Sequence, residues 1–424
     1  LLNRFRGALS CKLTTADMNR YKSQVNQIFR KHAGRQDFID YYNARSFISE
    51  LEELLYEDIE SMLKKKQYQE AFELTNYIFI RVGNQDMDDS DGGTGMLVEK
   101  CLEIWQEILS HCDIDLKRKM YQWYRDNLDG SVIDYMEEYI ERILFESFTE
   151  EEFLLDKLKL AEYKINSYMK EKDSWSREYY AGKWVMLRIA IMEEQKIEQS
   201  IIDEYCKNYL EINVVRKYYI ENCINRKDYN TAIHLLKEGK IINKDWPGLV
   251  LDYSLKLKNL YNKLENHELY EEELWSLVLK YKAGDVNLYR ELKSLYTNQE
   301  WEEKREIIFD KLSKRVAIDK LYKEEKLYDR LLEVVLNSSG LYKLIEYEKC
   351  LKNKYPKELL QKYETVVESM ASYTSDRKRY KEIVAVLRKM QKYPEGKEKV
   401  AKLVTDWQST YRNRPAMMDE LKKV

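Results

Sequence analysis

Hydrophobic residues recur at three- and four-residue steps along most of the chain. The stretch QYQEAFELTNYIFIRVG, residues 67–83, is a clear example, and Gly83 stands at its end. These steps place side chains on one face of an α-helix, so the stretch predicts an amphipathic helix. A glycine at its end is typical of a helix C-terminus that needs positive φ. The residues expected on the buried face are Tyr68, Ala71, Phe72, Thr75, Ile78, Phe79 and Val82.

Later stretches share one arrangement, in which a charged pair precedes an aromatic residue and then a run of apolar positions. Tyr229 and Trp301 stand in equivalent places 72 residues apart, whereas Tyr328 and Tyr380 are 52 apart. Gly239 ends one such stretch, as Gly83 does earlier. Degenerate helix–turn–helix repeats of the tetratricopeptide type, of about 34 residues each, have comparable spacing.

The pattern therefore predicts an all-α fold, a tetratricopeptide-like or irregular α-solenoid built from antiparallel helix pairs. Two or three separate helical bundles are the alternative. We place a division after residue 172, giving an N-terminal helical domain, 1–172, and a helical-repeat domain, 173–424. One continuous solenoid would remove that division.

Composition favours the same fold. The chain of 424 residues holds 13 glycines and 4 prolines, too few for the many tight turns of a β-protein. Charged residues make up 35%, against about 25% in a typical domain, as expected when helices expose much surface. The 35 tyrosines suit helix–helix seams, where the ring packs and the hydroxyl finds a polar partner. A ligand groove lined by tyrosines is the alternative.

Two short basic clusters are candidates for phosphate contacts, although the chain as a whole carries a formal net charge of −3. A nucleic-acid footprint is usually basic, so solvated helix faces are the simpler interpretation of both clusters. The residues are Lys64, Lys65 and Lys66 in the first cluster and Arg377, Lys378 and Arg379 in the second.

The spacing of the cysteines and the lack of familiar catalytic motifs argue against several classes of protein. None of the six cysteines belongs to a CxxC pair, which argues against a zinc site or a disulfide framework and predicts reduced thiols in the cytoplasm. No apolar run is long enough to cross a membrane, so we expect no membrane contact. The chain contains no HExxH and no GxSxG, and an enzyme is not expected.

The loop NQDMDDSDGGTG, residues 84–95, is the clearest local feature that could carry chemistry. It fits neither a complete calcium loop, which needs a ligand at every second position and a final glutamate, nor a phosphate loop, which needs Lys and Ser or Thr after the glycines. We expect it to join two helices, with Asp91 or Thr94 capping the second. The surplus acids form a weak cation candidate or a contact for a basic partner. These acids are Asp86, Asp88, Asp89 and Asp91.

Four stretches, in this order, resemble the long helical region that follows the zinc module in bacterial SWIM zinc-finger proteins. They are HAGRQDFIDYYNARSFISELEELL (32–55), VGNQDMDDSDGGTGML (82–97), LDGSVIDYMEEYIERILFESF (128–148) and the pair DRKRYKEIVAVLRKMQKY (376–393) and YRNRPAMMDEL (411–421). The family's zinc motif, CxCx(n)CxH, has no match in this chain. By resemblance, zinc would be bound only upstream of Leu1, and the chain would be the C-terminal part of a larger protein.

We therefore expect a non-enzymatic helical-repeat scaffold that binds a protein partner and needs no cofactor of its own. By resemblance, the upstream zinc module would add a contact with nucleic acid or protein. The first alternative is a nucleic-acid-binding helical array that uses the two basic clusters. The second is a metal-dependent enzyme, which requires Asp86, Asp88, Asp89 and Asp91 to converge within metal-ligand distance.

Overall fold

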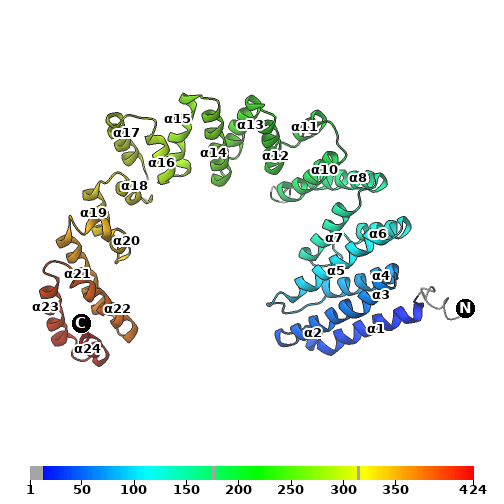
Figure 1. The fold of residues 1–424 in the computed structure, drawn as a ribbon, viewed down its shortest axis with the longest axis horizontal. Coiled ribbons are helices and arrows are strands. Elements are labelled where there is room, and N and C mark those ends of the chain that lie inside the picture. Colours follow the sequence, from blue (N-terminus) through cyan, green and yellow to red (C-terminus); the bar gives the residue numbers. More distant parts are fainter. Residues whose placement is uncertain (1–12, 174, 176, 313–315) are drawn as a thin grey trace, which may run out of the picture. The chain divides into compact units, whose positions relative to one another are not determined.

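The computed structural model describes residues 13–424 except 174, 176 and 313–315. The regular structure of these residues is helical (Figure 1), and their one β pairing is an isolated bridge between Ile39 and Met87. Helices that follow one another in the sequence pack side by side. The predicted all-α array of paired helices is confirmed.

The chain divides into two compact units, Leu1–Tyr219 and Ile220–Val424, and the division falls within α12 (Asn213–Asn225). The predicted boundary after residue 172 lies inside the first unit and stays a prediction. The other helices of the first unit are α1 (Thr15–His32), α2 (Tyr41–Glu53), α3 (Glu60–Lys64), α4 (Tyr68–Gly83), α5 (Gly93–His111), α6 (Ile114–Asp126), α7 (Asp134–Ser147), α8 (Glu151–Tyr168), α10 (Gly182–Glu194) and α11 (Gln199–Lys207).

The second unit continues the succession of short helices. They are α13 (Tyr229–Ile242), α14 (Pro247–Lys263), α15 (His267–Ser276), α16 (Val286–Lys293), α17 (Asn298–Lys311), α18 (Asp319–Glu324), α19 (Tyr328–Asn337), α20 (Tyr342–Leu351), α21 (Pro356–Tyr373), α22 (Arg377–Met390), α23 (Gly396–Thr410) and α24 (Pro415–Leu421). A short 3₁₀ turn (Arg35–Asp37) and π-helical segments at Leu54–Ile59, Arg177–Ala181 and Leu277–Tyr281 complete the described elements.

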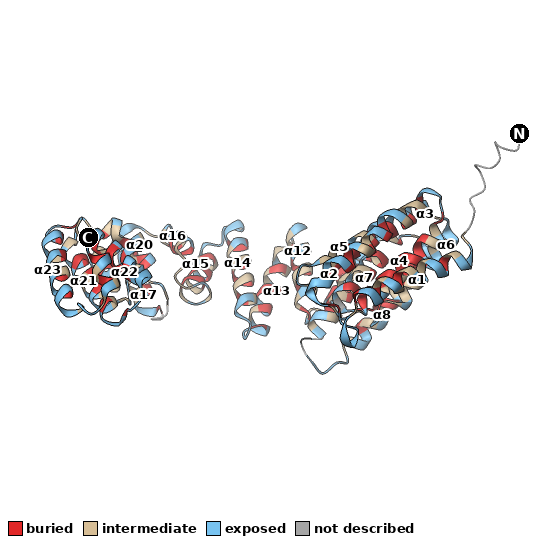
Figure 2. Ribbon diagram, turned by 90° about the horizontal axis from the view of Figure 1, so that it is seen from below, coloured by how far each residue is buried: buried red, intermediate tan, exposed pale blue. Residues whose placement is uncertain are grey.

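The buried faces follow the hydrophobic pattern. In α4, the predicted positions from Ala71 to Val82 are buried, and Tyr68 at the helix start is half-buried. Figure 2 shows buried and exposed positions alternating along the helices of both units. Because apolar side chains leave water where two helices meet, each helix is stabilised mainly by its packing against neighbours.

Among the described residues, four lysines occupy turns between helices in a backbone conformation that usually favours glycine. Lys66, Lys196, Lys227 and Lys326 have φ of 59°, 54°, 68° and 57°. In each turn, the N–H of the next residue donates to the carbonyl five residues earlier, which is the hydrogen-bond pattern of a Schellman motif. The bonds run from Gln67 to Met62, from Ile197 to Met192, from Asp228 to Cys223 and from Leu327 to Tyr322.

Ion pairs connect successive hairpins at a nearly constant sequence separation. Lys258 pairs with Glu291, 33 residues away, and Arg290 pairs with Glu324, 34 residues away. This separation matches the repeat length of about 34 residues expected for tetratricopeptide-like units. The same relationship recurs at Lys117–Glu150, Arg118–Glu152, Lys240–Glu273, Lys293–Glu325 and Lys399–Glu364.

Tyrosine hydroxyls at the seams donate to carboxylates that also accept from a cation. Tyr270 donates to Glu291, the partner of Lys258, at 2.5 Å. Tyr347 donates to the buried Asp319 at 2.8 Å, and Lys343 reaches the same carboxylate oxygen at 3.0 Å. These tyrosines therefore pack and hydrogen-bond at seams, as predicted for the tyrosine-rich composition.

Candidate functional site

The acidic loop joins α4 to α5, as expected, and its backbone is held by the segment that precedes α2. The Ile39 N–H donates to the Asp86 carbonyl at 3.0 Å, and the Asp88 N–H donates to the Ile39 carbonyl at 2.9 Å. Helix α5 begins at Gly93, and its N-cap residue, Gly92, has a φ of 71°. This pairing fixes the position of the loop beside α2.

Three of the four aspartates have a structural role within the loop. Asp89 accepts from the Thr94 N–H at 3.2 and 3.1 Å and so caps α5. The expected caps, Asp91 and Thr94, were therefore wrong: the N-cap residue is Gly92, and the carboxylate that accepts from the first turn is that of Asp89. Asp88 accepts from the backbone and hydroxyl of Ser90, and Asp91 accepts from the Tyr41 hydroxyl at 3.3 Å.

A hollow of about 360 Å³ lies between this loop and α2, and we call it the acidic-loop hollow. Its charged lining consists of Arg45 and the carboxylates of Glu52, Asp88, Asp89 and Asp91, so carboxylates exceed cations. Within the described part of the chain, no three His, Cys, Asp or Glu side chains are grouped so that they could hold a metal ion. The geometry gives no support to the metal-dependent alternative.

The two basic clusters lie at helix ends in different units. Lys64 ends α3, Lys65 is its C-cap and Lys66 occupies the following turn. Arg377, Lys378 and Arg379 form the first turn of α22.

Several of these cations already have carboxylate partners. Lys64 pairs with Glu60 at 3.7 Å, Arg377 with Asp419 at 3.1 Å and Arg379 with Glu382 at 3.4 Å. The remaining exposed cations, Lys65, Lys66 and Lys378, keep both clusters as candidates for phosphate contacts.

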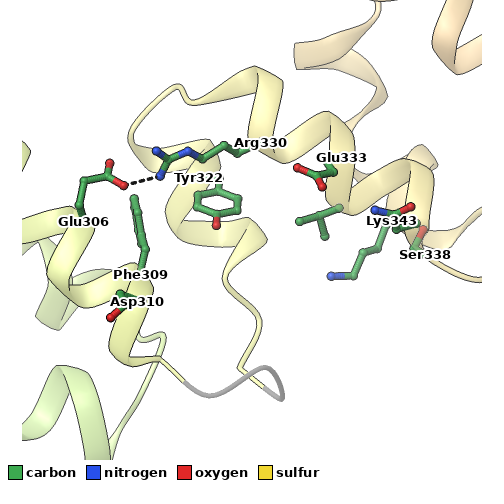
Figure 3. A pocket seen from close by; sticks show the side chains of 10 residues that line it. Glu306, Phe309, Asp310, Tyr322, Arg330, Glu333, Ser338 and Lys343 are labelled. Atoms are coloured by element: carbon green, nitrogen blue, oxygen red, sulfur yellow. Dashed lines mark hydrogen bonds and ion pairs between the residues drawn. The ribbon is translucent and has the colours of Figure 1, made fainter.

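A second hollow, of about 770 Å³, opens among α17, α18, α19 and α20 (Figure 3), and we call it the α17–α20 hollow. Arg330 lies at the centre of the contacts that form one wall. Its guanidinium donates to Glu306 at 2.7 Å and lies 5.7 Å from the centre of the Phe309 ring and 6.0 Å from that of Tyr322. The two rings meet edge to face at 5.0 Å. Cation–π contacts of this kind hold an arginine in place beside aromatic faces.

Polar groups of both signs complete the lining. Asp310, Glu333 and Asn337 are exposed, and Lys343 enters from α20. Partial burial alone would raise the pKa of Glu306, but hydrogen bonds from Arg330 and Arg305 outweigh it, so that pKa lies below its ordinary value. The wall therefore offers charged groups, an amide and aromatic faces to a ligand.

No serine, cysteine or histidine among the described lining residues stands beside a base as an activated nucleophile would. The described lining contains neither cysteine nor histidine, and its one serine, Ser338, donates its hydroxyl to the Val335 carbonyl at 2.7 Å. A serine nucleophile needs an adjacent base instead. Sequence reasoning did not find this hollow, because its residues come from four helices and no local motif links them. The local pattern nearest the hollow is the polar, turn-like stretch NSSG, residues 337–340.

Comparisons with known proteins identify no family for this chain. No family model matches, and no curated protein matches. A solved structure described as a "Circular tandem repeat protein with novel repeat topology and enhanced subunit contact surfaces" aligns with 96% of this chain and 97% of its own, at 11% identity and a TM-score of 0.19. That TM-score is too low to support an argument. The fold defines the class, an all-α helical-repeat protein. Among the described residues, no helix is long and apolar enough to span a membrane.

Proposed function

We propose that this chain is a non-enzymatic helical-repeat scaffold that binds an extended segment of a protein partner in the α17–α20 hollow. The observation that carries the proposal is the lining of this hollow, which combines a fixed arginine–aromatic wall with two exposed carboxylates and an exposed amide. Its volume of about 770 Å³ lies within the range of about 300–1,000 Å³ typical of ligand sites.

A peptide would use each kind of group in this lining. The Asn337 amide can donate to a peptide carbonyl and accept from a peptide N–H. Phe309 and Tyr322 offer apolar surface to a side chain, next to the guanidinium of Arg330. Asp310 and Glu333 are exposed carboxylates, which can accept from a lysine or arginine side chain of the bound segment.

Site-specific photo-crosslinking tests this proposal in cells. A photoreactive phenylalanine analogue at Asn337 reports what enters the hollow, and the same analogue at Lys402, exposed on α23, is the matched control. The proposal expects adducts specific to position 337 that protease removes and nuclease does not. Equal adducts at both positions, or none at position 337, would contradict it. Nuclease-sensitive adducts would favour the nucleic-acid alternative.

The acidic loop remains a candidate second contact, for a basic segment of the partner. Asp86 and Asp91 are exposed, and the acidic-loop hollow carries more carboxylates than cations. Two linked contacts raise overall affinity without a stronger individual contact. Replacing Asp86, Asp88, Asp89 and Asp91 with alanine should then weaken capture of the cross-linked partner.

The nucleic-acid alternative predicts a different response. Contacts from Lys64, Lys65, Lys66, Arg377, Lys378 and Arg379 to phosphates would make the affinity fall steeply with salt. The resemblance to bacterial SWIM zinc-finger proteins also stays a prediction, and it would place this scaffold beside a zinc module. Absence of oligonucleotide binding even at low salt would remove the alternative.

A further inference from the structure

A third hollow in the second unit has a different electrostatic character, and we call it the basic hollow. It measures about 540 Å³ and is lined by residues of α16, α18, α19 and α20 and of the turn between α18 and α19. Its cations are Arg290, Lys320, Lys323 and Lys326, and its carboxylates are Glu324 and Glu346. Positive charge therefore exceeds negative charge in the lining.

One cation and one carboxylate of the lining pair with each other, so the excess of positive charge rests on the three lysines. The Arg290 guanidinium donates two hydrogen bonds to the Glu324 carboxylate, of 2.7 and 2.5 Å, across successive hairpins. That bidentate pair leaves three lysines facing only Glu346 in the lining. All three lysines are exposed, so their ammonium groups can reach a ligand.

These lysines contrast with the cations of neighbouring seams. Lys293 pairs with Glu325 at 2.8 Å and Lys343 with Asp319 at 3.0 Å. Among the residues that the structure describes, no ion pair is found for the three lysines of the basic hollow. Lys323 instead lies 5.7 Å from the ring centre of Tyr347. These three lysines therefore differ from Lys293 and Lys343 in having no carboxylate partner among the described residues.

The start of α19 adds to the positive potential. Tyr328 is the first residue of α19 and lines the hollow, and the N-cap residue, Leu327, offers no side-chain acceptor. The unpaired N–H groups at a helix start carry a partial positive charge, which favours an anion nearby. Asp329 in the first turn is paired with Lys354, which offsets its charge, so the helix start and the lysines act in the same direction.

We propose that the basic hollow binds an acidic peptide segment, with glutamate or aspartate side chains of the ligand contacting Lys320, Lys323 and Lys326. A peptide can place its carboxylates over the lysines and an N–H donor over Glu346. A nucleic acid carries a charge at every phosphate, and the carboxylate of Glu346 in the lining would repel part of that backbone. The mixed wall therefore favours a peptide. This inference concerns a separate site and does not depend on what enters the α17–α20 hollow.

Binding of a fluorescein-labelled hexaglutamate peptide to the full chain, measured by fluorescence anisotropy at low salt, tests the proposal. We expect saturable binding that weakens at least tenfold in the variant Lys320→Ala/Lys323→Ala/Lys326→Ala. The matched control, Lys389→Ala/Lys397→Ala/Lys402→Ala, removes the same charge from exposed positions elsewhere in the unit and should bind as the wild type does. A hexaglutamine peptide should not bind.

Replacing the same three lysines with arginine keeps the charge and should retain binding, which separates loss of contact from loss of fold. The proposal is overturned by absence of hexaglutamate binding to the wild type, or by equal weakening in the hollow and control variants. It is also overturned if a thymidine oligonucleotide binds more tightly at the same lysines. None of these results changes the cross-linking expected at Asn337, so the two proposals fail independently.

Discussion

Lys258 and Glu291 stand 33 residues apart and form an ion pair of 2.7 Å between α14 and α16. Both side chains are partly buried, and Tyr270 donates to the same carboxylate. One repeat length thus separates a cation from its anion at each of several seams. A charge placed on one hairpin is neutralised by the next, which lets an array with small cores carry many charged residues.

Replacing Glu291 with alanine should lower the free energy of unfolding by about 2–3 kcal/mol, because Lys258 and Tyr270 both lose their partner in a partly buried seam. Equilibrium urea unfolding measures the change. The control is Glu204→Ala, which removes the exposed pair with Lys207 and should cost less than about 1 kcal/mol. Similar losses for both variants would mean that the seam pairs stabilise no more than surface pairs do.

The lysine turns predict a gain in stability from a single glycine. Lys66 has a φ of 59°, which a side chain with a Cβ adopts at a cost and glycine adopts freely. Lys66→Gly should therefore raise the free energy of unfolding by about 1 kcal/mol. Lys64→Gly lies two residues earlier, within α3, and should lower it by about 1 kcal/mol because glycine is a poor helix former. Both variants lose one lysine charge, so opposite changes in stability, measured by thermal unfolding, would show that backbone geometry decides the sign.

Gly83 and Gly239 show which part of the sequence interpretation was correct and which was not. Local periodicity correctly predicted the helices they belong to, but neither glycine has positive φ. A Cβ on Gly83 would lie 2.5 Å from Val132, and one on Gly239 would lie 2.8 Å from the ring of Tyr253. Both positions require a glycine because another segment packs closely against them, the loop before α7 at Gly83 and α14 at Gly239. Local pattern cannot reveal such contacts, nor the α17–α20 hollow, because they depend on tertiary neighbours.

Gly239→Ala should therefore destabilise the second unit by about 1–3 kcal/mol through overpacking against the buried ring of Tyr253. Gly95→Ala is the control, since a Cβ there meets no atom within 4 Å, and it should be neutral or slightly stabilising. Adding Tyr253→Leu should reduce the cost of Gly239→Ala, as measured by a double-mutant cycle in urea. A cycle with no coupling would contradict this explanation.

Lys157 predicts a pH dependence of stability in the first unit. Its side chain is fully buried, its ammonium donates to the Phe145 carbonyl at 2.8 Å, and burial lowers its pKa to about 8 against the pull of Glu194 and Glu150. Between pH 8 and the ordinary value of 10.5, the unfolded chain binds more protons than the folded chain. The contribution of Lys157 to stability should therefore rise with pH, by up to about 1.4 kcal/mol per pH unit.

Urea unfolding at pH 7, 8, 9 and 9.5 measures this slope. The wild type should gain stability relative to Lys157→Met above pH 8, and the difference should stay constant below it. Lys159→Met, at an exposed position on the same helix, should keep the pH dependence of the wild type. A wild-type difference that falls as pH rises would show that the folded chain holds this proton more tightly than the unfolded chain does.

Asp89 and Asp86 separate the structural role of the acidic loop from a role in binding. Asp89→Ala removes the acceptor for the Thr94 N–H and should lower the free energy of unfolding by about 1 kcal/mol, whereas Asp89→Asn keeps an acceptor and should cost less. Asp86→Ala leaves the backbone bridge to Ile39 intact and should be neutral in thermal unfolding. If Asp86→Ala nevertheless weakens capture of a cross-linked partner, its exposed carboxylate contacts that partner. If only Asp89→Ala weakens capture, binding depends on the loop conformation that Asp89 stabilises and not on the Asp86 carboxylate.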